Sequence, residues 1–209
     1  MIVVTVAAQL GAGGRPIAQR VAEVLGIPYL DNELVHQASL LAGVSEDALA
    51  DIDERRPTLL GYIADLLARY PTAAELGIPT VSVEPPLSQE SFRRMFEDVI
   101  LDVGTKGPAV IIGRAGNIIL KDKPWVLRLY LMAPLQFRIQ KISEREDVAP
   151  EIAKRMALES DKNRNGYHKT YYKSDWQDPA NYDLMLNTGR IGMETAVELI
   201  VSAAKSLST

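Results

Sequence analysis

The start of the chain holds the pattern that most limits the possible folds. An apolar, β-branched run from Ile2 to Ala8 has the length of one strand and ends in a glycine-rich turn, GAGG, at residues 11–14. Pro16 suits the first position of a helix, and apolar residues then recur at helical spacing until Gly26 ends the pattern. A buried parallel strand, a glycine turn and a helix are therefore expected in this order.

The rest of the chain continues to alternate between strand and helix patterns. Short apolar runs bounded by turn residues predict strands at residues 28–30, 109–112, 126–131 and 184–186. Apolar residues at helical spacing predict helices at residues 33–41, 46–52, 89–103 and 192–207, and a basic helix after Pro134. This alternation predicts an α/β fold, a three-layer α/β/α sandwich around a parallel sheet. Ligands of such folds bind beyond the carboxyl ends of the strands.

Composition excludes several classes of protein. The chain has 23 basic and 27 acidic residues, a net charge of −4, so it has no overall attraction for nucleic acid or an anionic membrane. It has no cysteine and only two histidines, His36 and His168, which argues against thiolate or histidine-rich metal sites, and no metal ligands are predicted. No apolar run of about 18 residues occurs, and no basic residue precedes Arg15. We therefore expect a cytoplasmic protein without a membrane or nucleic-acid partner.

The glycine turn predicts an anion site, because backbone N–H groups at a helix N-terminus attract phosphate. The residues expected to bind it are Gly11, Ala12, Gly13, Gly14, Arg15 and Pro16. The turn departs from the usual GxxxxGK[ST] phosphate loop. Whether the last glycine of that motif is aligned with Gly13 or with Gly14, the lysine and the hydroxyl residue that should follow it are missing. A dinucleotide-binding GxGxxG would need glycine in place of Pro16. A phosphate loop is favoured, with a dinucleotide loop and a purely structural turn as the alternatives.

Further charged residues follow the other predicted strands. Asp31 either contacts a ligand or caps the next helix, and Arg114 either grips a phosphate or pairs with a surface carboxylate. Arg138, Lys141 and Arg145 share one face of a helix, which is either functional or simply solvated.

A polar segment follows that helix. Residues 138–173 carry nine bases against six acids, and DKNR at residues 161–164 precedes the tyrosine-rich NGYHKTYYKSDW. This segment is too polar for a core and is expected to close over a polyphosphate. Its mixture of bases and aromatics also allows single-stranded nucleic acid, which the net charge disfavours. We expect both His168 and His36 to be ordinary, non-catalytic side chains, with His168 on the surface.

Three long stretches of the chain resemble the cytidylate kinase-like family, a branch of the P-loop nucleoside monophosphate kinases. They read VTVAAQLGAGGRPIAQRVAEVLGIPYLDNELVHQAS, VIIGRAGNIILKDKPWVLRLYLMAPLQFRIQKI and DPANYDLMLNTGRIGMETAVELI. The GxGGRxIA loop is itself typical of this branch. The resemblance implies a single domain over residues 1–209. Its core is residues 1–31, 107–148 and 180–209, its monophosphate-binding insert is residues 32–106, and its lid is residues 149–179.

The resemblance also implies roles for particular residues. Asp31 matches the aspartate after the second strand, and Arg114 matches the arginine that grips the monophosphate. Asp161, Lys162 and Arg164 match the charged lid. Asp31, Arg114 and Asp161 are expected to bind the acceptor. Ala115 departs from the family, in which an aspartate that helps to read the nucleoside follows the arginine. The acceptor is therefore either a cytidylate-like nucleotide or another small phosphorylated metabolite.

These observations together give a hypothesis for the reaction. The γ-phosphoryl group of ATP passes in line to the acceptor, with Mg²⁺ bridging the nucleotide phosphates. Arg15 takes the place of the missing lysine, while Arg138, Lys162 and Arg164 gather the developing charge. One alternative is a regulator that binds nucleotide without catalysis, and a more distant one is an NAD(P)-dependent oxidoreductase. Exposed apolar residues in the lid leave room for a homodimer. The proline-rich segment 71–86 has no assigned role.

Overall fold

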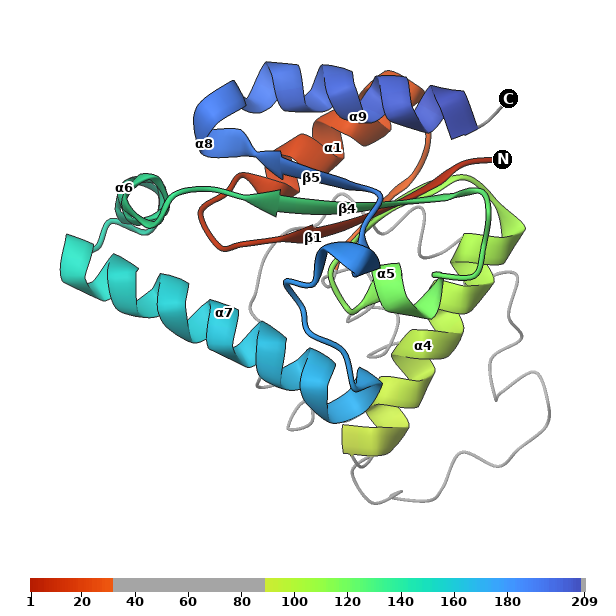
Figure 1. Cartoon of the computed structure of the whole chain (residues 1–209), viewed down its shortest axis with the longest axis horizontal. Helices are drawn as coiled ribbons and strands as arrows, with labels where there is room; N and C mark the ends of the chain where they lie inside the picture. The colour runs from red at the N-terminus through yellow and green to blue at the C-terminus, as the bar shows by residue number, and fades with distance from the viewer. Residues whose placement is uncertain (32–88, 208–209) are drawn as a thin grey trace, which may run out of the picture. The chain divides into compact units, whose positions relative to one another are not determined.

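The computed structural model describes residues 1–31 and 89–207 (Figure 1). The predicted helices at 33–41 and 46–52, His36 and the segment 71–86 lie outside these residues. The strands are β1 (Val3–Ala8), β2 (Tyr29–Leu30), β3 (Ala109–Ile112), β4 (Val126–Met132) and β5 (Leu184–Asn187). The helices are α1 (Gly14–Leu25), α4 (Gln89–Lys106), α5 (Gly116–Ile119), α6 (Leu135–Glu146), α7 (Pro150–Tyr172), α8 (Thr188–Ile191) and α9 (Met193–Leu207), with a 3-10 turn at Pro179–Asn181.

The strands form one sheet in the order β2-β3-β1-β4-β5, and the β1–β3, β1–β4 and β4–β5 pairs are parallel. β1 lies at the centre, where Val4 is opposite Val110 on one side and Leu127 on the other. The predicted strands all form within two residues of the expected bounds. Because the sheet is parallel, the carboxyl ends of β1, β3, β4 and β5 lie at one edge.

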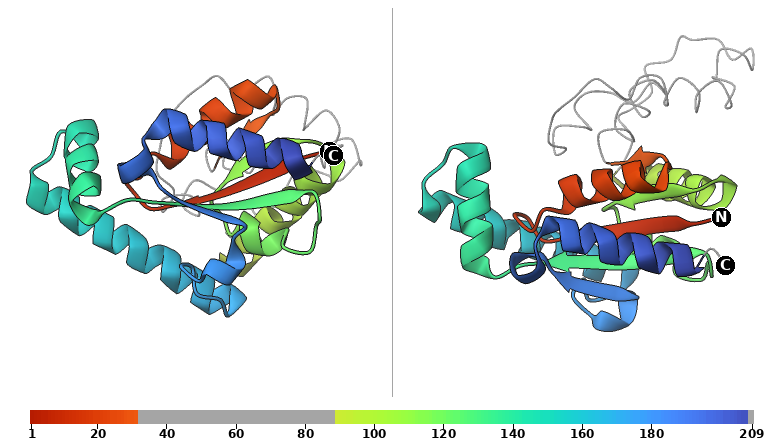
Figure 2. Two further views of the ribbon diagram at one scale, coloured as in Figure 1. Left: turned by 45° about the horizontal axis from the view of Figure 1, so that its top comes forward. Right: turned by 90° about the horizontal axis from the view of Figure 1, so that it is seen from above.

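One face of the sheet is covered by α1 and α9 (Figures 1 and 2). Alternate residues of β1 point toward these helices, because side chains along a strand alternate between faces. The buried cluster on this face includes Val4, Val6, Ile17, Val21 and Ile200. It accounts for the β-branched strands and for the helical spacing in α1.

The opposite face of the sheet carries α5 and an aromatic cluster. Tyr130 of β4 packs against Trp176, with ring centroids 5.3 Å apart and a T-shaped arrangement, and against Tyr182 at 5.1 Å. The phenolic O–H of Tyr182 donates to the carbonyl of Trp176 (2.6 Å). The expectation that the tyrosine-rich segment is too polar for a core is therefore wrong for its end, where Trp176 is 2% exposed.

The chain divides into two compact units. The first comprises residues 1–29 and 100–209 and holds the glycine turn, α6, α7 and most of the sheet. The second comprises residues 30–99 and includes Asp31, which follows β2 and is itself buried. Within the described ranges, no helix has the length and apolar character needed to span a membrane.

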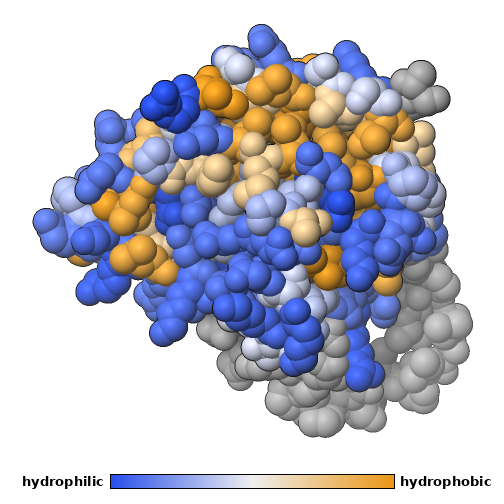
Figure 3. All heavy atoms as spheres, in the orientation of Figure 1, coloured by the Kyte–Doolittle hydropathy of each residue, from blue (hydrophilic) through white to orange (hydrophobic). Residues whose placement is uncertain are grey.

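The surface of the first unit is uneven in character. In Figure 3, hydrophilic side chains dominate the surface over α7, whereas hydrophobic ones gather toward α9 and β5. Exposed apolar residues on α9 are Met193, Leu199 and Leu207.

Candidate active site

The glycine turn connects the end of β1 to the start of α1. Gly11 (φ 85°) and Gly13 (φ 77°) both adopt left-handed backbone conformations, which glycine reaches without strain. α1 begins at Gly14, so Pro16 is the third helical residue and not the first as expected. Proline is still tolerated there, since the N–H groups of the first turn have no intrahelical acceptor.

Two of the glycines are required by close packing. A Cβ at Gly14 would lie 2.4 Å from the Cβ of Ala8, and one at Gly11 would lie 2.7 Å from the carbonyl oxygen of Arg138. Side-chain-free residues therefore let the backbone of the turn approach both β1 and the first turn of α6.

The N-terminus of α1 has no anionic group of its own. Its N-cap, Gly13, offers no side-chain hydrogen bond, and the first turn contains no acidic residue. The partial positive charge and the unpaired N–H groups of this helix end are thus not compensated by a side chain of α1. An external anion such as phosphate fits this position.

Neighbouring strand ends hold the turn in place. The backbone N–H of Gln9 donates to Leu131 (2.9 Å), and its side-chain carbonyl accepts from the N–H of Ala133 (3.1 Å). The hydroxyl of Thr188 donates to the carbonyl of Ala12 (2.8 Å). These clamps were missed from the sequence, because Gln9 and Thr188 belong to no recognisable motif.

Arg164 supplies a cation without a carboxylate partner among the residues that the structure describes. Its guanidinium lies 5.6 Å from the ring centroid of Trp176 and donates to Ser160. Burial lowers the pKa of Arg164, and the nearby charge of Asp161 opposes that shift. An arginine held against an aromatic ring in this way keeps its charge available for an anion.

The basic strip on α6 does not act as a single surface. Arg138 is buried and donates to Asp161 and to two backbone carbonyls, whereas Lys141 and Arg145 are exposed and pair with Glu144 and Glu146. Arg138 is therefore an internal side chain, whereas Lys141 and Arg145 each belong to a solvent-exposed ion pair.

Arg114 follows β3 in an unusual backbone segment. Gly113, Arg114 and Ala115 all have positive φ (80°, 50° and 55°), which costs conformational energy at the two residues that are not glycine. Burial lowers the pKa of Arg114, and Tyr167 and Tyr172 of α7 lie close enough to oppose the shift. The arginine thus lies at the carboxyl edge of the sheet beside the tyrosine-rich end of α7.

Arg15 and Lys162 are exposed, and neither makes a hydrogen bond or ion pair with another residue of the described ranges. Both are therefore available to a ligand. His168, by contrast, is 4% exposed, so the expectation of a surface histidine is wrong. Burial lowers its pKa to about 4, and its Nδ1 has no hydrogen-bond partner.

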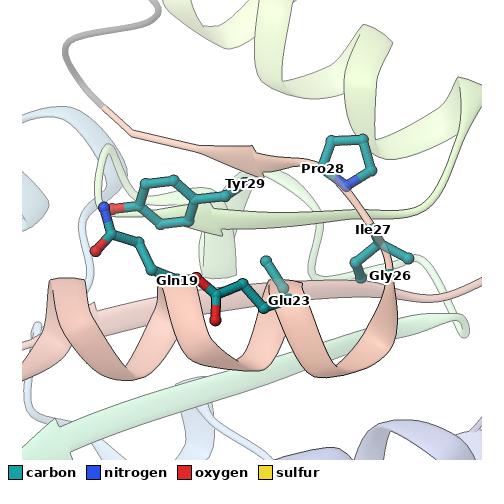
Figure 4. Close-up of a pocket in the computed structure, with 7 residues that line it drawn as sticks. Gln19, Glu23, Gly26, Ile27, Pro28 and Tyr29 are labelled. Carbon is teal, nitrogen blue, oxygen red and sulfur yellow. The ribbon is translucent and has the colours of Figure 1, made fainter. Parts of the chain in front are cut away.

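A shallow pocket of about 630 Å³ lies elsewhere in the first unit, between the C-terminal half of α1 and the approach to β2 (Figure 4). Gln19, Glu23 and Tyr29 provide its polar groups. It adjoins the end of α1 opposite to the glycine turn, and its charged group is acidic, so it does not suit phosphate. In the described part of the chain, no cluster of three or more histidines and acids is arranged to hold a metal ion.

The family model and the curated relatives that match this chain indicate the same family. A model of the cytidylate kinase-like family matches residues 3–190. A cytidylate kinase from Methanopyrus kandleri is 25% identical over 99% of this chain and 94% of its own length. Another, from Methanocaldococcus jannaschii, is 29% identical over 51% of this chain, and the match spans 61% of that protein.

Solved structures share the fold. A protein from Eubacterium ventriosum, described as uncharacterized, has a TM-score of 0.72 at 21% identity, with 99% of both chains covered. The shikimate kinase from Bacteroides thetaiotaomicron has a TM-score of 0.51 at 12% identity, with 98% of both chains covered. These likenesses support the α/β kinase-type fold predicted from the sequence.

Proposed function

The chain belongs to the cytidylate kinase-like family, and we propose that it is a kinase that transfers the γ-phosphoryl group of ATP to a nucleoside monophosphate or a related small phosphorylated acceptor. The observation that carries this proposal is the N-terminus of α1, where glycines expose the backbone and neither a capping side chain nor an acid occupies the anion position. The cytidylate kinases among its relatives support the same reaction class.

In the proposed reaction, the turn from Gly11 to Gly14 binds the phosphates of ATP through its backbone N–H groups. Arg15 replaces the lysine of the usual phosphate loop, and Arg164 and Lys162 stabilise the charge on the transferred group. The acceptor oxygen forms a bond to the γ-phosphorus as the bond to the β-phosphate oxygen breaks, and ADP leaves. The protein contributes positioning and charge, without a covalent intermediate.

Mg²⁺ is proposed as the accompanying cation. Pro16 follows Arg15 where a hydroxyl ligand would stand in the usual phosphate loop, so the ion would be held by nucleotide phosphates and water. This arrangement fits a helix end that carries no acidic side chain of its own. A cytoplasmic location is part of the proposal.

The acceptor is proposed to bind beyond β3. Arg114, at the strained turn after this strand, would hold its phosphate. The family resemblance also assigns Asp31 to acceptor binding. Ala115 stands where true cytidylate kinases carry an aspartate, so the base or sugar must be read by other residues. Cytidylate is the first acceptor to test, beside the other nucleoside monophosphates.

A phosphoryl-transfer assay with ATP and Mg²⁺ across the nucleoside monophosphates tests the proposal, with ATP binding measured by calorimetry on the same preparation. Transfer that depends on one acceptor supports the kinase and identifies its substrate. The absence of lysine and hydroxyl from the loop favours one alternative, a regulator that binds nucleotide without turnover. ATP binding without transfer to any acceptor would favour that regulator, and absence of ATP binding would reject both functions.

A further inference from the structure

The side chain of Arg138 lies inside the protein, where α6, α7 and the glycine turn meet. Its side chain is 3% exposed, although it carries a full positive charge and stands at the start of a helix whose other bases are solvated. A buried arginine is stable only when its N–H groups have acceptors. The identity of those acceptors indicates what the residue does.

Each of the three guanidinium nitrogens of Arg138 donates to a protein oxygen. Nε donates to the carbonyl of Leu10 (2.9 Å), directly before the glycine turn. Nη1 donates to a carboxylate oxygen of Asp161 (2.7 Å), and Nη2 donates to the carbonyl of Ala157 (3.2 Å), both on α7. One guanidinium therefore joins the base of the glycine turn to the middle of α7.

The backbone of Arg138 makes a second contact with the same turn. The carbonyl oxygen of Arg138 lies so close to Gly11 that a Cβ there would approach it to 2.7 Å. Both the side chain and the main chain of Arg138 thus define where residues 10 and 11 lie. Figure 1 shows α6 beside the start of α7. From α6, Arg138 contacts both the residue before the glycine turn and α7.

The electrostatics separate Arg138 from its neighbour Arg164. Arg138 is neutralised by Asp161, whereas Arg164 has no carboxylate partner within the described residues and lies against Trp176. A phosphate would have to break the buried pair to reach Arg138, which is costly. A phosphate could approach Arg164 without breaking an ion pair of this kind.

We propose that Arg138 is a positioning residue, which with Asp161 fixes the glycine turn relative to α7, and that neither residue contacts the reacting phosphates. Displacement of α7 would then shift Leu10 and Gly11, so the geometry of the turn depends on the position of this helix. This proposal revises the charge-gathering role of Arg138 and the acceptor-binding role of Asp161 expected from the sequence. It rests on the proposed function for its consequence in catalysis, but the contact itself is testable without turnover.

The experiment compares Arg138→Lys, Arg138→Met and Asp161→Asn with the control Lys141→Met, which removes an exposed base from the same helix. Amide hydrogen exchange is measured at Gln9 and Ala12, whose backbone N–H groups donate to the carbonyls of Leu131 (2.9 Å) and Gln9 (3.0 Å). The Kd for ATP is measured on each full-length variant, and kcat is added where transfer occurs. We expect exchange in the turn to accelerate at least about tenfold in all three variants, with weaker ATP binding, because a charge-assisted hydrogen bond is lost. The control should match the wild type in both.

The Arg138→Lys variant is decisive and is the mildest change to the fold. Lysine keeps the charge but cannot donate to Leu10, Ala157 and Asp161 together. The proposal predicts faster exchange in the turn and a raised Kd, with kcat within about threefold of the wild type at saturating ATP. A kcat loss of about 100-fold with unchanged exchange and unchanged Kd would overturn it and restore a catalytic role. If no acceptor is phosphorylated, exchange in Asp161→Asn and Arg138→Lys still decides the contact, so failure of the proposed function remains distinguishable.

Discussion

The guanidinium of Arg164 lies over the indole ring of Trp176, with its central carbon 5.6 Å from the ring centroid. Trp176 is fixed in turn by its edge-to-face contact with Tyr130 of β4. A side chain of α7 is thereby held against the sheet by an aromatic surface, while its charge has no carboxylate partner in the part of the chain that is described. This arrangement prepares Arg164 to meet a phosphate.

Replacing Arg164 should impair transfer more than folding. Arg164→Gln removes the charge proposed to stabilise the transferred group, and we expect kcat to fall by about 100-fold or more, with a modest change in the free energy of unfolding. Lys169→Gln is the matched control, since Lys169 is exposed on the same helix. A loss of only a few-fold in Arg164→Gln would remove this residue from the mechanism.

Gly14 and Gly166 provide a matched pair for the packing of the glycine turn. Gly14→Ala forces a methyl group to within 2.4 Å of the Cβ of Ala8, so we expect a loss of about 1–3 kcal/mol in the free energy of unfolding. A methyl group added by Gly166→Ala, in the C-terminal half of α7, meets no atom within 4 Å, so this variant should stabilise the fold by up to about 1 kcal/mol. Denaturant unfolding of both variants measures the difference. Equal effects would show that the turn does not pack against β1 as described.

His168 should make stability depend on pH in the mildly acidic range. Burial lowers its pKa from 6.5 to about 4, with Asp175 opposing, so the unfolded chain binds the extra proton between these values. The free energy of unfolding is therefore unaffected by His168 titration above about pH 6.5. It decreases as the pH falls toward 4, by about 3 kcal/mol at most. In the His36→Gln variant, His168 is the only histidine and its NMR titration is unambiguous. A midpoint near 6.5 in the folded protein would contradict its burial.

The ion pair between Arg128 and Asp183 joins β4 to the residue that precedes β5. Asp183 accepts from Nη2 (2.5 Å), Nε (3.1 Å) and the backbone N–H (2.8 Å) of Arg128. Burial raises the pKa of Asp183, but the hydrogen bonds from Arg128 outweigh it, and the net shift is downward. The stabilisation is therefore present above about pH 4 and is lost as pH falls further.

The variant Asp183→Asn tests this pair. At neutral pH it should lose about 1–2 kcal/mol of unfolding free energy, and the gap to the wild type should narrow on acidification. Glu146→Gln, in an exposed pair on α6, should change stability by less than about 0.5 kcal/mol. A gap for Asp183→Asn that stays constant from pH 7 to pH 2 would exclude ionic stabilisation.

The strands and the glycine turn were predictable because their signals are local. β-Branched runs mark β1 and β3, a largely apolar run marks β4, and a turn of four residues with three glycines marks an exposed backbone at a helix start. The burial of Trp176 was not predictable, because it arises from contact with Tyr130, which is distant in the sequence. The burial of His168 was not predictable either, because the sequence around it is polar.

The same distinction applies to the candidate site. Arg15, Lys162 and Arg164 stand out by charge and position, and the structure leaves them without carboxylate partners within its described ranges. Gln9 and Thr188 clamp the turn through partners 124 and 176 residues away, which no local pattern reveals. Arg138 stands out equally by charge, yet only the fold shows that its donors are directed at Leu10, Ala157 and Asp161.

Calorimetric titration with ATP and Mg²⁺, on the wild type and on Gly11→Ala, tests the central claim that the glycine turn binds the phosphates of ATP. At Gly11 (φ 85°) an added Cβ both strains the backbone and meets Arg138, so the turn cannot keep its shape. The account predicts binding in the range of about 1 μM to 1 mM for the wild type and at least about tenfold weaker binding for the variant. Equal affinities, or a folded wild type that does not bind ATP, would contradict it.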